Sequence, residues 1–168
     1  MRPPLSTLGI LHTAISLIPL VAGLVAFARH RRILPGTTSG RAYLAGLALS
    51  VLTAFGLSST GGFNPGHALG LLTLLVAGGA LAIPRLGFLG RARPYLSTLG
   101  LSFTFFLLLV PGINETLTRL PAGHPLASGP ESPLVKAALL GWLTLFAVGA
   151  LVQMLALRAS LARSRAST

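Results

Sequence analysis

The chain has 168 residues, of which 52% are hydrophobic and only 9% charged, with a mean hydropathy of +0.80. Soluble domains carry about 25% charged residues, so this composition excludes an ordinary water-exposed fold, and its hydrophobicity excludes a disordered chain. A net charge of +11 suggests nucleic acid in a soluble protein, but these cations lie between long apolar segments, so we expect no nucleic-acid partner. The absence of cysteine excludes disulfides, thiolate metal sites and cysteine nucleophiles.

Long apolar segments predict membrane-spanning helices. A helix needs about 20 mostly apolar residues to cross the hydrocarbon core of a bilayer. Five segments fit this requirement and none contains Asp or Glu; they lie at about 8–28, 43–59, 66–83, 96–113 and 134–157. The sequence therefore predicts an all-α fold in one domain, residues 1–168, built as a bundle of five transmembrane helices in the lipid bilayer. The longest connection, 114–133, is expected to form an irregular cap.

Proline and asparagine residues mark the expected ends of these helices. Pro19 lies inside the first segment and predicts a kink there. Asn64-Pro65 has the pattern of an N-cap followed by proline at the first helical position, which predicts the start of the third helix. Further prolines predict the end of the third helix, the end of the fourth and the start of the fifth, at Pro84, Pro111-Gly112 and Pro133.

The distribution of positive charge predicts the orientation of the bundle. Three cations, Arg2, Arg119 and Lys136, lie on one side. The other ten lie in the first and third connections and in the tail: Arg29, Arg31, Arg32, Arg41, Arg85, Arg91, Arg93, Arg158, Arg163 and Arg165. The positive-inside rule then places the N-terminus outside and the C-terminus in the cytoplasm of a bacterial inner membrane. The less favoured alternative is that Ala26-Phe27-Ala28 ends a cleaved signal peptide.

Two histidines are the main candidates for a cofactor site. His12 lies inside the first span and His67 lies in the first turn of the third, both toward the outer side. Ionisable groups inside a membrane are costly, and two histidines on two helices could bind haem b or a metal ion axially. The preferred alternative is that each histidine hydrogen-bonds a backbone carbonyl or a hydroxyl group across the bundle, or faces interfacial water.

The outer connection and the first connection hold the other titratable candidates. His124 with Glu115 and Glu131 could hold a metal ion, but three solvated loop residues are the favoured interpretation. Glu115 is expected to pair with Lys136 or with Arg119. His30, which lies among arginines, is expected to help anchor the chain to anionic headgroups.

Small and aromatic residues predict packing. Glycine and alanine allow helices to approach closely, and they recur at Gly66 and Gly70, at Ala77 to Ala80, and at Ala137, Ala138 and Gly141. These positions predict helix–helix contacts within the bundle. Aromatic residues near the span ends predict anchors at the membrane surface, at Tyr43, Tyr95 and Trp142.

The first 80 residues resemble a family of small bacterial membrane proteins. The resemblance rests on the segments 11–16, 40–43 and 66–69, which include His12, Arg41 and His67. They are similar to the domain of unknown function 2306 family, in which a first-helix His, an "HR-x-x-G-R-x-Y" segment and a third-helix His recur. The middle His of that pattern is replaced here by the Thr37-Thr38-Ser39 segment. The resemblance implies a multi-helix membrane bundle and no established activity.

Two functions remain open from the sequence. The first is a non-catalytic accessory or complex-forming subunit, associated with other membrane proteins or with copies of itself. The second is a haem- or metal-binding redox protein that uses His12 and His67. Catalysis finds no support, because the spans contain no acid and the chain shows no nucleophile motif.

Overall fold

The computed structural model describes residues 6–57, 62, 64–121 and 123–166. Within these ranges every regular element is a helix, as predicted. The α-helices are α1 (Thr7–His30), α2 (Thr38–Ala54), α3 (Pro65–Ala82), α4 (Arg93–Arg119) and α5 (Pro133–Ala166). Two short 3₁₀ helices, η1 (Ile83–Arg85) and η2 (Gly87–Ala92), connect α3 to α4.

Four of these helices are long and apolar enough to cross a membrane. They are α1, α3 continued by η1, α4 preceded by η2, and α5. The helix α2 is shorter, with 17 residues, and is not among these four. It also differs from the predicted segment 43–59, because it begins at Thr38 and ends at Ala54, while residues 58 and 59 lie outside the described part.

Helix ends follow local capping rules at most boundaries. The Thr37 side chain accepts a hydrogen bond from the backbone N–H of Gly40 at 3.1 Å, which explains why α2 starts earlier than hydropathy indicated. Arg31 ends α1 in a left-handed conformation, with φ of 58°. The predicted Asn64 cap, Pro65 start and Pro133 start are confirmed.

The prediction that Pro111-Gly112 ends the fourth helix is wrong. Pro111 lies inside α4, which continues to Arg119. Proline is tolerated inside transmembrane helices when neighbouring groups satisfy the freed carbonyl, so it is a weaker stop signal than in water. The connection that was expected over 114–133 therefore reduces to Leu120–Ser132, and it folds back on α4 through a 2.9 Å bond from the Ala127 N–H to the Leu117 carbonyl.

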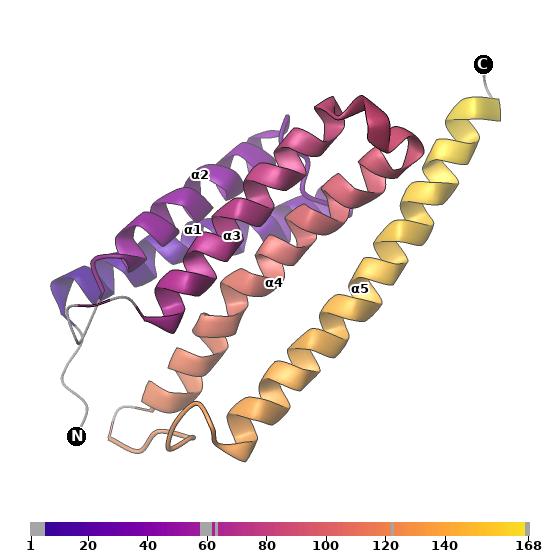
Figure 1. Ribbon diagram of the computed structural model, residues 1–168. Helices are drawn as coiled ribbons and strands as arrows, with labels where there is room; N and C mark the ends of the chain where they lie inside the picture. Colours follow the sequence, from indigo (N-terminus) through magenta and orange to yellow (C-terminus); the bar gives the residue numbers. More distant parts are fainter. Residues whose placement is uncertain (1–5, 58–61, 63, 122, 167–168) are drawn as a thin grey trace.

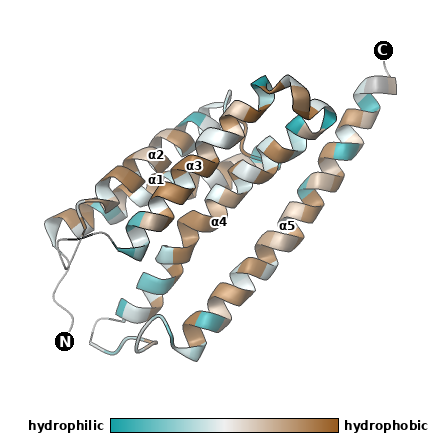
Figure 2. Ribbon diagram, viewed as in Figure 1, coloured by the Kyte–Doolittle hydropathy of each residue, from teal (hydrophilic) through white to brown (hydrophobic). Residues whose placement is uncertain are grey.

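The helices run side by side, alternately up and down, with α1 and α2 on one side of α3 and α4 and with α5 along the free side of α4 (Figure 1). Apolar residues fill the middle of the helices, and polar residues gather toward their ends (Figure 2). We call the end formed by the α1–α2 connection, η1, η2 and the C-terminal part of α5 the cationic end. The other end, with the connections α2–α3 and α4–α5, is called the acidic end because it holds Glu115 and Glu131.

Helices α1 to α4 are packed through glycines and a buried core. A Cβ atom on Gly23 would lie 2.6 Å from the Phe105 ring, and one on Gly46 would lie 2.8 Å from Cδ of Pro19. Gly70 faces Val51 and Gly100 faces Ala80 in the same way, at 3.0 and 2.8 Å. These glycines let the backbones of neighbouring helices approach each other closely.

Tyr43 is part of this core, so its predicted role as an interfacial anchor is wrong. Its side chain is fully buried, and its hydroxyl shares a 2.7 Å hydrogen bond with the hydroxyl of Thr104 on α4. Because α2 begins at Thr38, Tyr43 lies more than one turn inside the helix and faces the neighbouring helices. Of the predicted small-residue contacts, Gly70, Ala77 and Ala80 lie within the bundle, whereas Gly78, Gly79 and Gly141 are exposed with open space beside them.

Helix α5 packs along α4 through one stripe of side chains. Trp142, which was also expected at the interface, stacks on Phe106 and donates its indole N–H to the Phe106 carbonyl at 3.0 Å. Phe146 contacts the rings of Phe103 and Phe106, and Gln153 accepts a 2.7 Å bond from Ser102. The remaining faces of α5 are exposed and apolar, as expected for a helix surrounded by lipid.

Candidate functional sites

His12 lies in a polar cluster between α1 and α2 near the acidic end. Its Nδ1 atom is 2.9 Å from the hydroxyl of Thr53, which donates its own proton to the carbonyls of Leu49 and Ser50. His12 Nδ1–H therefore donates and the Thr53 oxygen accepts. On the other side of the ring, Nε2 is 3.5 Å from the hydroxyl of Ser16, which also bonds Ser50 at 2.6 Å.

His67 closes the first turn of α3. Asn64 caps the helix by accepting the His67 backbone N–H at 3.1 Å, and the His67 Nδ1 atom accepts the Asn64 N–H at 3.4 Å. This reciprocal pair is a capping box in which histidine occupies the position usually held by glutamate or glutamine. With Nδ1 as an acceptor, Nε2–H donates to the Ala54 carbonyl at 3.2 Å. The ring also stacks on Phe55, with 4.9 Å between the centroids.

Both histidines thus bind the last turn of α2, through the adjacent residues Thr53 and Ala54. The prediction that each histidine bonds a hydroxyl or carbonyl of a neighbouring helix is confirmed. The ring nitrogens of His67 and Nδ1 of His12 are already in hydrogen bonds, so a metal or haem iron would have to displace these bonds. In the part of the chain that the structure describes, no group of three or more His, Asp or Glu side chains is placed to hold a metal ion.

The acids at the acidic end form two separate ion pairs. Glu115 pairs with Arg119 one turn later on α4, as one of the two predicted alternatives states. Glu131 pairs instead with Lys136, at 2.9 Å. The hydrogen bond and charge of Lys136 lower the pKa of the Glu131 carboxyl from its ordinary value. Both carboxylates therefore already have cationic partners on their own side of the molecule.

Polar side chains deeper in the bundle also have structural partners. Gln153 of α5 connects three elements, because its oxygen accepts from Ser102 of α4 and its nitrogen donates to the Arg31 carbonyl at the end of α1, at 2.8 Å. Among the described residues, Asn114 Oδ1 is the one buried side-chain nitrogen or oxygen atom without a hydrogen-bond partner. Several polar side chains inside this protein therefore join one helix to another, whereas others, such as Thr73 and Thr118, bond a carbonyl of their own helix.

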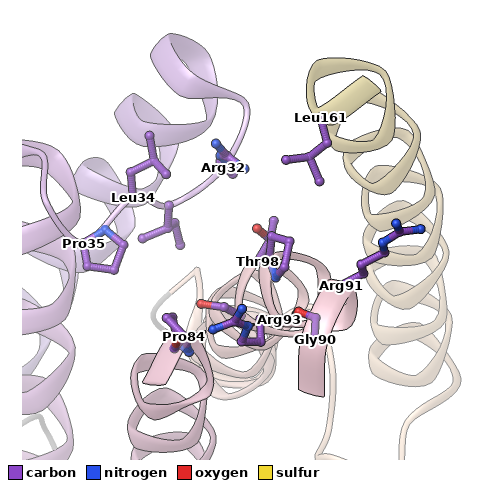
Figure 3. A pocket seen from close by; sticks show the side chains of 12 residues that line it. Arg32, Leu34, Pro35, Pro84, Gly90, Arg91, Arg93, Thr98 and Leu161 are labelled. Atoms are coloured by element: carbon purple, nitrogen blue, oxygen red, sulfur yellow. Dashed lines mark hydrogen bonds between the residues drawn. The ribbon is translucent and has the colours of Figure 1, made fainter. Parts of the chain in front are cut away.

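A cavity of about 660 Å³ opens at the cationic end, between the α1–α2 connection, η1, η2, α4 and the end of α5 (Figure 3). Three arginines line it: Arg32 from the α1–α2 connection, Arg91 from η2 and Arg93 from the start of α4. Figure 3 shows Arg32 and Arg93 on opposite sides of the opening, with Arg91 extending toward α5. The other lining residues are Ile33, Leu34, Pro35, Pro84, Gly90, Pro94, Ser97, Thr98 and Leu161.

The sequence alone could not predict this cavity, although it showed the three arginines that line it. The distribution of charge identified these arginines as orientation signals, and nothing in their spacing showed that two connections and the end of α5 would border one cavity. A second hollow lies on the outer face of α1 and α2 between Leu17 and Ala42, and it is almost wholly apolar. Neither hollow is lined by His12 or His67.

Comparison with protein-family models, with curated proteins and with solved structures finds no match to this chain.

Proposed function

We propose that this chain is a non-catalytic accessory or complex-forming subunit of a bacterial inner membrane. In this proposal all five α-helices span the bilayer, with the N-terminus outside and the cationic end in the cytoplasm. The 17 residues of α2 extend about 25 Å at 1.5 Å per residue, which is within reach of a bilayer that thins locally. The gathering of arginines at one end supports the orientation. We also propose that the chain is related to the domain of unknown function 2306 family, which its first 80 residues resemble.

The observation that carries the proposal is the use of the interior polar groups. The His12 cluster, the His67 capping box, the Tyr43–Thr104 pair and the Gln153 bonds all join one helix to another. An active site needs polar groups that are free to meet a substrate, usually in a concave pocket. Here these groups serve to hold the bundle together, which favours a structural role.

Exposed glycines on α3 support contact with further membrane-spanning helices. Gly78 and Gly79 are adjacent and exposed, and a Cβ at either position would meet nothing within 4 Å. Glycine weakens a helix by about 1 kcal/mol relative to alanine, and in membranes it is enriched where another helix approaches closely. The pair supplies such a surface on the outside of the bundle.

The size of the protein in gently extracted native membranes tests this proposal. We expect particles clearly larger than one 17.3 kDa chain with its detergent, and we expect Gly78→Leu with Gly79→Leu to reduce them to single chains. The matched control is Gly149→Leu on α5, another exposed glycine with open space beside it, which should leave the size unchanged. Single chains in the unaltered protein, or equal loss in both variants, would contradict the proposal.

An absorbance spectrum tests the alternative of a haem or metal cofactor. If His12 and His67 ligated haem, the protein purified from its own membranes would show a Soret band that His12→Ala or His67→Ala removes. A spectrum of that kind would overturn the structural roles that the hydrogen bonds assign to these residues.

A further inference from the structure

We propose that the cavity at the cationic end is a binding site for a phosphate group, presented by the headgroup of an anionic phospholipid or by a free phosphate ion. The site would hold the phosphate between Arg32, Arg91 and Arg93. The guanidinium groups of Arg32 and Arg91 can each donate two hydrogen bonds to phosphate oxygens, and Arg93 adds a positive charge to the wall. This binding function is independent of the subunit role proposed above.

The first support is the charge of the cavity, which the chain itself does not neutralise. The sequence contains only two acids, and both are paired at the acidic end, with Arg119 and Lys136. The 27 residues of α4 separate Arg93 from Arg119 by about 40 Å along the helix. Three arginines around one opening repel each other, and an anion from outside the chain would relieve that repulsion.

The second support is that two of these arginines have uncommitted guanidinium groups. Neither Arg32 nor Arg91 donates a side-chain hydrogen bond to another residue in the described ranges. Arg93 is held in place, because its Nε donates to the Gly90 carbonyl at 3.0 Å and its Nη1 donates to the Pro84 carbonyl at 3.3 Å. One arginine therefore shapes the wall of the cavity while two remain available to a ligand.

The third support is the backbone that carries Arg91 and Arg93. Gly90 adopts φ of 47° and ψ of −122°, a conformation that residues with a Cβ rarely adopt. This turn lies inside η2, three residues before α4 begins at Arg93, and the backbone N–H groups in the first turn of α4 also favour an anion. Arg91 and the start of α4 both follow this turn within three residues, and both border the cavity.

The lining of the cavity fits a phospholipid headgroup in particular. Apolar side chains form the rest of the wall, including Ile33, Leu34 and Leu161, and the hydroxyl residues Ser97 and Thr98 lie at the start of α4. A glycerophosphate needs both kinds of surface, because its phosphate meets cations while its glycerol and acyl carbons meet apolar groups. Basic pockets between helices at the cytoplasmic face of a membrane are suited to such headgroups.

Binding in neutral detergent micelles tests the site without the field of a charged membrane. The full chain is purified in dodecyl maltoside, and native mass spectrometry counts retained lipid after titration with cardiolipin, phosphatidylglycerol or phosphatidylcholine. We expect retention of one anionic lipid per chain and no retention of phosphatidylcholine. In Arg32→Gln/Arg91→Gln, affinity for that lipid should fall by at least about tenfold, since this variant loses the charge-assisted hydrogen bonds of both uncommitted guanidinium groups.

The matched control removes two arginines from the same end of the molecule. Arg41 and Arg163 are exposed and do not line the cavity, so Arg41→Gln/Arg163→Gln should change the affinity by less than about twofold. Both double variants keep Arg93 and its structural bonds, and an unchanged thermal unfolding midpoint would show that they fold. If lipid affinity fell equally in both double variants, the lipid would be attracted by the overall positive charge of this end. That result would overturn the proposed site.

A competition with inorganic phosphate distinguishes the two sources of the ligand. A free phosphate ion is the ligand if two results are found together. Inorganic phosphate at millimolar concentration displaces the lipid, and the Arg32→Gln/Arg91→Gln variant also binds phosphate more weakly. If the lipid is retained against phosphate, the headgroup is the ligand. If the unaltered chain binds neither anionic lipid nor phosphate, the proposal is wrong.

Discussion

Helices α1 to α4 and helix α5 are similarly apolar, yet they are packed in different ways. Within the first four helices, glycines such as Gly46 and Gly100 bring backbones so close that a Cβ would lie 2.8 Å from its neighbour. Along α5 the glycines Gly141 and Gly149 face outward, and contact with α4 depends on large side chains around Trp142. The same residue type therefore makes a contact in one region and leaves a surface free in the other.

This difference shows what determines helix packing in a membrane. Lipid tails are as apolar as leucine, so burial of apolar surface does not itself drive helices together. Close backbone approach and hydrogen bonds do, and the first four helices have both, in the glycine contacts and in pairs such as Tyr43–Thr104. We therefore expect α1–α4 to form the stable core and α5 to be an addition to it.

The largest expected effect comes from filling a glycine contact in the core. In Gly46→Leu the new Cβ would clash with Cδ and the backbone nitrogen of Pro19, and the backbone cannot move aside as a flexible side chain could. We expect a loss of about 3 kcal/mol in the free energy of unfolding, measured by titration with SDS in mixed micelles. The control Gly149→Leu should change stability by less than about 1 kcal/mol. Equal losses would mean that the two regions are packed alike.

A smaller effect is expected from His67, which joins α2 to α3. His67→Ala removes the capping-box bond to Asn64 and the bond to the Ala54 carbonyl, and it leaves that carbonyl without this donor. We expect a loss of about 1–2 kcal/mol in the same SDS titration. His124→Ala, in the exposed α4–α5 connection, is the matched control and should be neutral. A neutral His67→Ala would contradict the structural role of this histidine.

The hydrogen bonds that attach α5 to the other helices are expected to contribute less to the free energy of unfolding than those of His67. Gln153→Leu removes the bonds to Ser102 and to the Arg31 carbonyl, and interhelical hydrogen bonds in membranes contribute about 0.6 kcal/mol each on average. We expect a loss of about 1 kcal/mol in the free energy of unfolding. We also expect faster proteolysis near Arg158, in the C-terminal part of α5. Thr144→Val is the control, because Thr144 bonds the Leu140 carbonyl of its own helix. A loss as large as that of Gly46→Leu would place α5 in the core.

The smallest effect is expected from the exposed pair of Glu131 and Lys136. Because Lys136 lowers the pKa of Glu131, the pair stabilises the fold above the ordinary pKa of a glutamate and loses that effect as the pH falls through the lowered value. Glu131 is exposed to water, so Glu131→Gln should leave the SDS midpoint unchanged at pH 7. Lys136→Gln should behave in the same way. A pH-dependent shift near neutrality in either variant would show a coupling that the structure lacks.

Local signals in the sequence were sufficient for the helices but not for their contacts. Asn64-Pro65 and Pro133 could be located because capping and proline geometry depend on a few adjacent residues. The prediction that α4 ends at Pro111 was wrong, because neighbouring groups in a membrane can satisfy the carbonyl that proline leaves free, so proline is a weak stop signal there. Tyr43 was misplaced because its partner, Thr104, is 61 residues away and no local pattern indicates that contact.

The candidate sites also contain some features that the sequence could predict and others that it could not. The bonds of His12 and His67 to neighbouring helices could be expected, since buried imidazoles need partners, but the capping box could not, because histidine is unusual at that position. The cavity at the cationic end depends on how the α1–α2 and α3–α4 connections meet the end of α5. Its arginines were visible in the sequence, but the open cavity that Arg32 and Arg93 border was not.

Removal of α5 tests most directly whether α1–α4 form the core. A chain that ends after residue 128 keeps the Ala127 contact on α4 and lacks α5. Because the protein has no cysteine, dyes can be attached at Gly36→Cys and Gly87→Cys, two exposed positions with open space in the α1–α2 and α3–α4 connections. Energy transfer between the dyes should equal that of the full chain and be lost only on SDS unfolding. Transfer that collapses in the shortened chain before SDS is added would contradict the account.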